Sequence, residues 1–185
     1  MDFLPIFLDV REQPCLVVGA GAVAERKAAL LRRAGARVTM AAAFRDEDLT
    51  GYAVVIAATS DEAVNRTVAA AARAQRIPVN VVDQPALCSF ILPSIIERAP
   101  LIVAVSSGGA APVLARLLRA RLESLIPAGY GRLAALAGAF RDRVKARFKP
   151  QEQAALERWL DTCKMMQHAP ELVELPDPFE EVAGG

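Results

Sequence analysis

The fold is decided by residues 15–24, which read C-L-V-V-G-A-G-A-V-A. A short apolar run is followed by the spacing G-x-G-x-x-A and by a helical pattern, as where the first strand of a dinucleotide-binding domain turns into its helix. In this interpretation Gly19 makes the tight turn, Gly21 lets the main chain approach a pyrophosphate, and Ala24 lets the helix pack closely on the sheet. The N–H groups of Ala22 and Val23 would bind the phosphates. The alternative is a glycine-rich turn that only packs a strand against a helix.

Apolar strands and amphipathic helices alternate along the residues on either side of this turn. Strands are expected at residues 15–18, 37–40, 53–58, 79–82 and 101–105. Helices are expected at residues 22–34 and 62–74, the first ending at Gly35 and the second beginning after Asp61 as its N-cap. Residues 4–8 are either a short first strand or an extended arm. The alternation predicts an α/β fold with a Rossmann-like, doubly wound parallel sheet.

The character of the chain changes after residue 111. Helices are expected at residues 113–125, 130–148 and 152–166, and residues 170–185 carry three prolines and five acids. We therefore expect a dinucleotide-binding domain at 1–111, a helical region at 112–168 and a loose acidic tail at 169–185. Residues 116–149 hold nine basic and two acidic residues, whereas residues 150–185 hold two basic and eight acidic residues. Pairing within a dimer, an anionic ligand and simple solvation all account for this charge pattern.

Bulk composition excludes several classes of function. The net charge of +1 gives no pull toward nucleic acid, and no apolar run is long enough to span a membrane. The N-terminus shows no signal peptide, and three scattered cysteines, Cys15, Cys88 and Cys163, argue for a reducing cytoplasm. We expect Cys15 to be a core residue.

Six segments, in order, resemble the N-terminal module of siroheme synthase, which also occurs alone as a precorrin-2 dehydrogenase and sirohydrochlorin ferrochelatase. They are L-P-I-F-L-D-V (4–10), V-V-G-A-G-A-V-A-E-R-K-A-A-L-L (17–31), I-A-A-T-S-D-E-A-V-N (56–65), V-N-V-V-D-Q-P (79–85), S-F-I-L-P-S-I-I (89–96) and V-A-V-S-S-G-G-A-A-P-V-L-A-R-L-L-R (103–119). The resemblance implies NAD-dependent oxidation of precorrin-2 to sirohydrochlorin, and in bifunctional members insertion of Fe²⁺. It also implies that the helices up to residue 148 form a dimerisation region, so we expect a homodimer.

The sequence departs from the family pattern in two places. About one βα unit is missing between residues 40 and 53. In the strand order 3-2-1-4-5 the lost strand would lie at the sheet edge, and about a dozen residues remain for the crossover, which is near the minimum. No methyltransferase segment follows, so only the dehydrogenase and chelatase steps are expected.

Asp83 ends a predicted strand, where ligands of open α/β sheets bind, and its carboxylate could accept a proton. The resemblance implies that Asp83 is the catalytic aspartate; otherwise it is a strand end before a proline turn. Asn80 and Thr59 either touch the nicotinamide or ribose, or cap main-chain groups. No acid follows residues 37–40 to bind the ribose, so main-chain contacts from Ala42 and Ala43 would hold the adenosine. NAD rests on the resemblance, because Arg45 leaves NADP open.

An anion site is expected where Ser106, Ser107 and Gly108 precede a helix. Arg98, Arg116 and Arg119 would clamp carboxylates of the tetrapyrrole substrate, or are ordinary surface charges. No resident metal is expected, because no Cys/His cluster has ligand spacing and His168, the only histidine, lies near the tail. Two other functions stay open: a non-catalytic dinucleotide-binding regulator or assembly subunit, and a chelatase alone.

Overall fold

The computed structural model of this protein describes residues 2–45 and 49–147. Contacts divide the chain into two compact units. The first comprises Met1–Leu92 and Gly108–Ala111, and the second comprises Pro93–Ser107 and Pro112–Gly185.

The first unit is a parallel α/β sheet. Its elements are β1 (Pro14–Val18), α1 (Ala22–Arg33), β2 (Arg37–Ala41), β3 (Val54–Ala57), α2 (Glu62–Ala74) and β4 (Val79–Val81). The four strands are ordered β2-β1-β3-β4, and every neighbouring pair is parallel. The Rossmann-like prediction is confirmed, and each predicted boundary in this unit agrees with the structure to within two residues.

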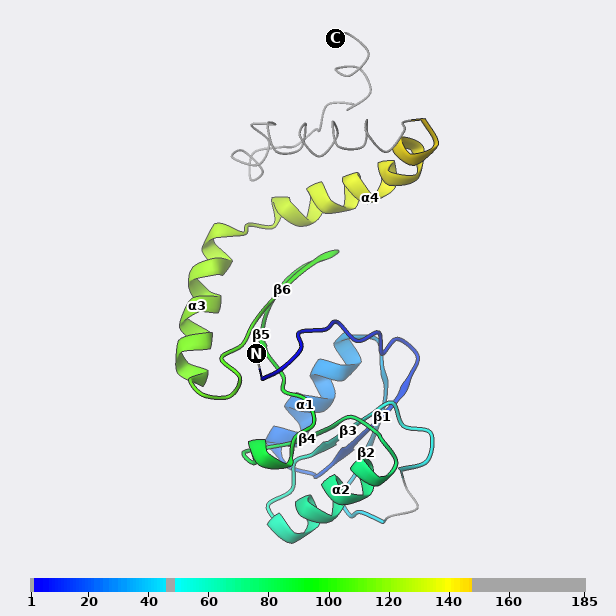
Figure 1. The fold of residues 1–185 in the computed structure, drawn as a ribbon, viewed down its shortest axis with the longest axis vertical. Helices are drawn as coiled ribbons and strands as arrows, with labels where there is room; N and C mark the ends of the chain where they lie inside the picture. The colour runs from blue at the N-terminus through cyan, green and yellow to red at the C-terminus, as the bar shows by residue number, and fades with distance from the viewer. Residues whose placement is uncertain (1, 46–48, 148–185) are drawn as a thin grey trace. The chain divides into compact units, whose positions relative to one another are not determined.

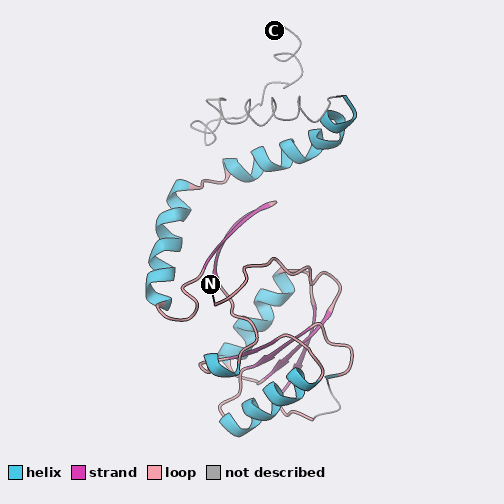
Figure 2. Ribbon diagram, in the orientation of Figure 1, coloured by secondary structure: helices cyan, strands magenta, loops and turns pink. Residues whose placement is uncertain are grey.

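The two helices cover opposite faces of this sheet, as Figures 1 and 2 show. Cys15 and Val17 of β1 pack with Ala28 of α1, whereas Leu16 and Val18 pack with the buried residues of α2. Burial on both faces explains why β1 and β3 read as continuous apolar runs rather than alternating ones. Cys15 is fully buried, as predicted for a core residue.

The shortened crossover leaves β2 at one edge of the described sheet. This is the edge at which the missing strand would have paired, as predicted. Leu49 anchors the crossover, because its side chain is fully buried in the cluster beneath α2. The connection between β2 and β3 thus contributes a core residue without a further βα unit. Residues 46–48 of the crossover lie outside the described residues.

The second unit begins with an antiparallel hairpin. Strands β5 (Ser94–Arg98) and β6 (Leu101–Val105) pair in register from Ser94 with Val105 to Arg98 with Leu101. Residues 101–105 do form a strand, but the prediction that they join the parallel sheet is wrong. The two-residue connection is the physical reason, because a parallel pair needs a crossover of a dozen or more residues. Contacts thus assign the hairpin to the second unit, whereas the sequence placed residues 1–111 in one domain.

Two helices follow the hairpin, α3 (Pro112–Leu125) and α4 (Gly129–Arg147). They correspond to the first two helices predicted for this region, with Pro112 in the first turn. Of α3, only Ala115 is buried. Its large exposed apolar side chains are Val113, Leu114, Leu117, Leu118 and Leu125. The predicted helix at 152–166, the tail at 169–185, Cys163 and His168 lie outside the described residues.

The N-terminal segment of the first unit is the extended arm of the two predicted alternatives, because the described residues before β1, 2–13, contain no strand. Leu4, Ile6 and Phe7 are each at least 69% exposed. The arm therefore contributes little to the core of its own unit.

Candidate functional site

The turn between β1 and α1 requires glycine at its first position. Gly19 has φ +138°, and its N–H donates to the Ala41 carbonyl oxygen at 2.8 Å. A Cβ at Gly19 would lie 2.8 Å from the Ala58 carbonyl carbon and closer still to its oxygen. The predicted tight turn is confirmed, and it also brings the β1 turn against the loop that follows β3.

No contact among the described residues requires glycine at the second position of the motif. Gly21 is the N-cap of α1 with ordinary extended dihedrals, and no side chain caps the helix. A Cβ at this position would meet no atom within 4 Å. The N–H groups of Ala22 and Val23 thus begin a helix with no side chain over them, an arrangement suited to a phosphate group. The space over Gly21 fits the close approach of a dinucleotide pyrophosphate, whereas Ala24 is fully buried against the sheet.

The strand order locates the crevice for such a ligand. The chain passes from β1 to β2 on one side and then crosses to β3 on the other, so the order reverses at β1. Ligands of open α/β sheets bind at this reversal, outside the carboxyl ends of the strands. Gly19 follows β1 and Ala58 follows β3, so their contact lies at the carboxyl ends of these two strands.

Thr59 lies at the edge of this crevice. Its hydroxyl donates toward the Asn65 side-chain oxygen at 2.8 Å or the Asp61 carbonyl oxygen at 3.0 Å, and it accepts from the Asp61 N–H at 3.2 Å. The capping alternative for Thr59 is therefore present in the structure. Because its single hydrogen is already used, Thr59 can offer a ligand only an acceptor lone pair.

Asp83 lies in the turn after β4, with an exposed side chain and φ +58°. Aspartate tolerates this left-handed conformation better than most residues. The chain then passes through the short 3₁₀ helix η2 (Pro85–Leu87) and returns along β4. There the Val81 N–H donates to Cys88 Sγ at 3.2 Å, and the Val79 N–H donates to Ser89 Oγ at 2.8 Å. These bonds fix both ends of the turn that presents the Asp83 carboxylate.

Asn80 is nearly buried inside this arrangement. Its Nδ2 donates to the Phe90 carbonyl oxygen at 3.1 Å and to Cys88 Sγ at 3.5 Å. The side-chain amide thus joins β4 to the returning segment. Contact of Asn80 with a cofactor stays a prediction.

Lys27 of α1 was missed by the sequence reasoning. Burial, followed by the charge of Arg26, lowers the pKa of Lys27, while Asp83 and Cys88 act in the opposite direction. A partly buried ammonium group therefore shares its electrostatic environment with Asp83. Its spacing of four residues from Val23 is the signal that could have found it, because such residues lie on one helix face.

On the adenosine side, Ala42 and Ala43 follow β2 as exposed residues, and Arg45 is exposed as well. No side-chain acid precedes Arg45 in this stretch. Main-chain contact of Ala42 and Ala43 with adenosine stays a prediction.

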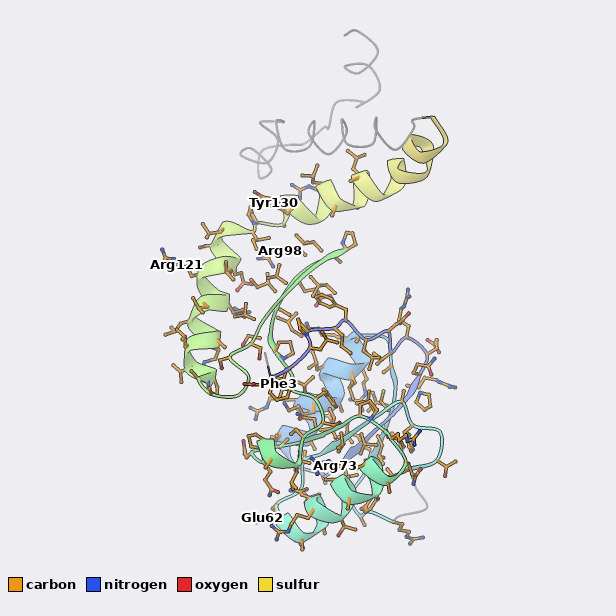
Figure 3. The ribbon with its side chains drawn as sticks, in the orientation of Figure 1. Phe3, Glu62, Arg73, Arg98, Arg121 and Tyr130 are labelled. Atoms are coloured by element: carbon orange, nitrogen blue, oxygen red, sulfur yellow. The ribbon has the colours of Figure 1, made fainter. Side chains whose placement is uncertain are left out.

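The predicted substrate arginines lie in the second unit. Arg98 Nε donates to the Ile126 carbonyl oxygen at 2.9 Å and Nη1 to the Glu97 carbonyl oxygen at 3.0 Å (Figure 3). Arg98 and Arg119 also both pair with Glu123. Arg98 thus joins the hairpin to α3, whereas the pair of Arg119 with Glu123 lies within α3, and Arg116 is the exposed member of the set.

The predicted anion site is divided between the units. Ser106 and Ser107 belong to the second unit, while Gly108 belongs to the first and has φ +66°. Binding of substrate by these three residues stays a prediction. Within residues 2–45 and 49–147 no group of three or more His, Cys, Asp or Glu side chains could hold a metal ion. A search of the same residues finds no helix with the length and hydropathy needed to cross a membrane.

Three family models match the chain in succession. They are described as putative NAD(P)-binding at residues 6–94, sirohaem biosynthesis protein central at 98–125, and sirohaem synthase dimerisation region at 129–160. The last model extends into residues that the structure does not describe. A solved structure titled "SirC, precorrin-2 dehydrogenase" matches 89% of this chain and 92% of its own, with a TM-score of 0.70 and 21% sequence identity. That likeness shows a shared fold.

Similar sequences come from longer proteins. The siroheme synthase of Nitrosospira multiformis is 54% identical over 178 residues, covering 83% of this chain and 38% of the relative. That of Methylobacillus flagellatus is 53% identical over 174 residues, covering 83% of this chain and 37% of the relative. The chain thus spans somewhat over a third of the length of these curated relatives. The order of the three models and the identity to these relatives show that the chain belongs to the family of the N-terminal module of siroheme synthase.

Proposed function

We propose that this chain is an NAD-dependent dehydrogenase that oxidises precorrin-2 to sirohydrochlorin. The observation that carries the proposal is the uncapped start of α1 at the reversal of strand order, with open space over Gly21. The same unit presents the exposed Asp83 carboxylate at the end of β4. Family membership supports precorrin-2 as the substrate.

The residues of the chain divide the work between binding and proton transfer. The N–H groups of Ala22 and Val23 bind the pyrophosphate, and the absence of a side chain at Gly21 allows it to approach. NAD⁺, when bound, supplies the acceptor for a hydride. The Asp83 carboxylate accepts the proton that the substrate loses together with that hydride, and then passes it to water. The substrate thereby loses two electrons and two hydrogens.

We further propose Fe²⁺ insertion into sirohydrochlorin as a second reaction of the same site. Two pyrrole protons must leave as the metal enters, and an exposed carboxylate such as Asp83 suits their removal. In this proposal Fe²⁺ is a substrate. We also propose a homodimer, supported by the match to a dimerisation region, and a cytoplasmic location, supported by the scattered cysteines.

The deciding experiment incubates the purified chain anaerobically with precorrin-2, with and without NAD⁺, and follows the absorbance spectrum. We expect sirohydrochlorin to form only when NAD⁺ is present. Metallation of supplied sirohydrochlorin without any NAD⁺-dependent oxidation would replace the proposal with a chelatase alone. NAD⁺ binding with neither reaction would indicate a regulatory or assembly protein.

The role of Asp83 is tested with Asp83→Asn. Asparagine adopts φ near +58° readily, so the turn should be kept, which alanine would not ensure. We expect the rate of oxidation to fall by about 10²–10⁴-fold with NAD⁺ binding unchanged, the range for loss of a general base. Glu62→Gln is the matched control, because Glu62 is an exposed carboxylate of the same unit that pairs with Arg66. Full activity in Asp83→Asn would overturn the assignment.

A further inference from the structure

One of the two buried polar side chains in the described part of the chain is Asn65 of α2, at 2% exposure. A buried amide is unfavourable unless hydrogen bonds replace those it made with water. Asn65 has such partners, and all of them belong to one residue outside its helix.

That residue is Thr59, in the loop after β3. The Asn65 Oδ1 accepts from the Thr59 N–H at 3.3 Å and from its hydroxyl at 2.8 Å, and Asn65 Nδ2 donates to the Thr59 carbonyl oxygen at 3.1 Å. A single amide thus holds the donor and the acceptor of the Thr59 main chain. Rotation of either adjoining peptide plane would break at least one of these bonds.

The helix itself does not need this amide. Asp61 already caps α2 by accepting from the N–H groups of Ala63 and Val64. Asparagine also has a lower helix propensity than leucine or alanine, either of which could fill a buried helix position. The side chain of Asn65 therefore serves the loop rather than the helix.

The loop that it fixes follows the carboxyl end of β3 and contacts the glycine turn. Ala58 precedes Thr59, donates its N–H to the Val18 carbonyl oxygen at 2.8 Å, and places its own carbonyl against Gly19. Movement of Thr59 would shift this carbonyl, and the glycine turn packs directly on it. The position of the turn, and with it the start of α1, depends on the loop after β3.

We propose that Asn65 is a positioning residue of the dinucleotide site, holding the loop after β3 in the position that keeps the glycine turn competent to bind the pyrophosphate. The proposal rests on the proposed binding of NAD⁺. In this proposal Asn65 does not contact the cofactor. It affects cofactor affinity through Thr59 and Ala58.

The test is Asn65→Asp, which keeps the shape and the acceptor but replaces the Nδ2 donor with an oxygen facing the Thr59 carbonyl. We expect the dissociation constant of NAD⁺, measured by calorimetry on the full chain, to rise at least about tenfold. The Michaelis constant for NAD⁺ should rise in parallel, while kcat at saturating NAD⁺ stays within about threefold because Asp83 lies on another loop. Amide exchange at residues 57–61 should accelerate in the variant without ligand.

Val68→Ala is the control for a purely structural effect, because Val68 is fully buried in the same helix and touches no loop hydrogen bond. It should lower the thermal midpoint while leaving the dissociation constant within about twofold. Equal losses of affinity in both variants, or unchanged affinity in Asn65→Asp, would overturn the proposal. A wild-type chain that binds no NAD⁺ would overturn the proposed function and this role together, and unchanged loop exchange in Asn65→Asp would show separately that the amide does not fix the loop.

Discussion

The two units of this chain differ in how fully they bury their apolar side chains. In the first unit β3 is buried at every position, and the helices on both faces complete the core. In the second unit β6 alternates between partly buried and exposed residues, and α3 buries only Ala115. Apart from its N-terminal arm, the first unit buries its apolar side chains within its own core, and its loops at the strand ends are left for a ligand. The second leaves an apolar helix face for another surface to cover.

The self-sufficient packing of the first unit should be most sensitive at Gly19. Gly19→Ala introduces a Cβ into the Ala58 carbonyl at a backbone conformation that suits glycine alone. We expect the free energy of unfolding to fall by about 3 kcal/mol or more, from strain and overpacking together. Urea unfolding followed by circular dichroism measures this change.

Gly21→Ala is the matched control two residues away. Its Cβ would meet open space at allowed dihedrals, so the free energy of unfolding should stay within about 0.5 kcal/mol. NAD⁺ binding should weaken nonetheless, since the methyl group occupies the space proposed for the pyrophosphate. An equal loss of stability in both variants would contradict the distinction between a glycine of the fold and a glycine of the site.

Sequence patterns predicted the first unit well because its physical signals are local. The glycine spacing and the continuous apolar runs identify β1, β3 and the turn at Gly19 without tertiary information. Strand β5 was not predicted, and β6 was assigned to the parallel sheet because residues 101–105 are apolar throughout, and such a run does not reveal whether one face or two are buried. The two-residue gap after Arg98 was the overlooked signal.

The candidate site was predictable only where its residues lie at strand ends or in glycine turns. Asp83 satisfied that rule. Asn65 and Lys27 did not satisfy it, because each lies within a helix, where a polar residue gives no signal of a site. Their roles depend on contacts with Thr59 and on the neighbourhood of Asp83, which only folding brings about.

The exposed apolar face of α3 in the second unit is tested with Leu117→Glu. Leu117 is 63% exposed, so the charge should cost the isolated chain little stability. In the proposed homodimer the carboxylate would be buried, and we expect the dissociation constant to rise by about tenfold to a hundredfold in sedimentation experiments. Ala70→Glu adds the same charge to an exposed position of α2 in the first unit and should leave the dimer intact. A monomeric wild type at micromolar concentration would contradict the interpretation of this face.

The smallest expected effect concerns a partly buried charged residue of the first unit, Lys27. Burial lowers the pKa of Lys27 below its ordinary value of 10.5, so the unfolded chain binds more protons than the folded chain between the two values. The free energy of unfolding should therefore increase as pH rises between these two pKa values, because the folded protein releases the Lys27 proton first.

Lys27→Met removes this titration, so the variant should be favoured over the wild type at neutral pH and should lose that advantage as pH approaches 10.5. Urea unfolding of both proteins across this range measures the difference, in which the contributions of all other titrating groups cancel. Arg32→Met is the control, because it removes an exposed positive charge that pairs with Glu25 on the same helix. Its difference from the wild type should not vary with pH. If the difference in free energy of unfolding between Lys27→Met and the wild type is also independent of pH, burial of the Lys27 ammonium group does not destabilise the folded protein.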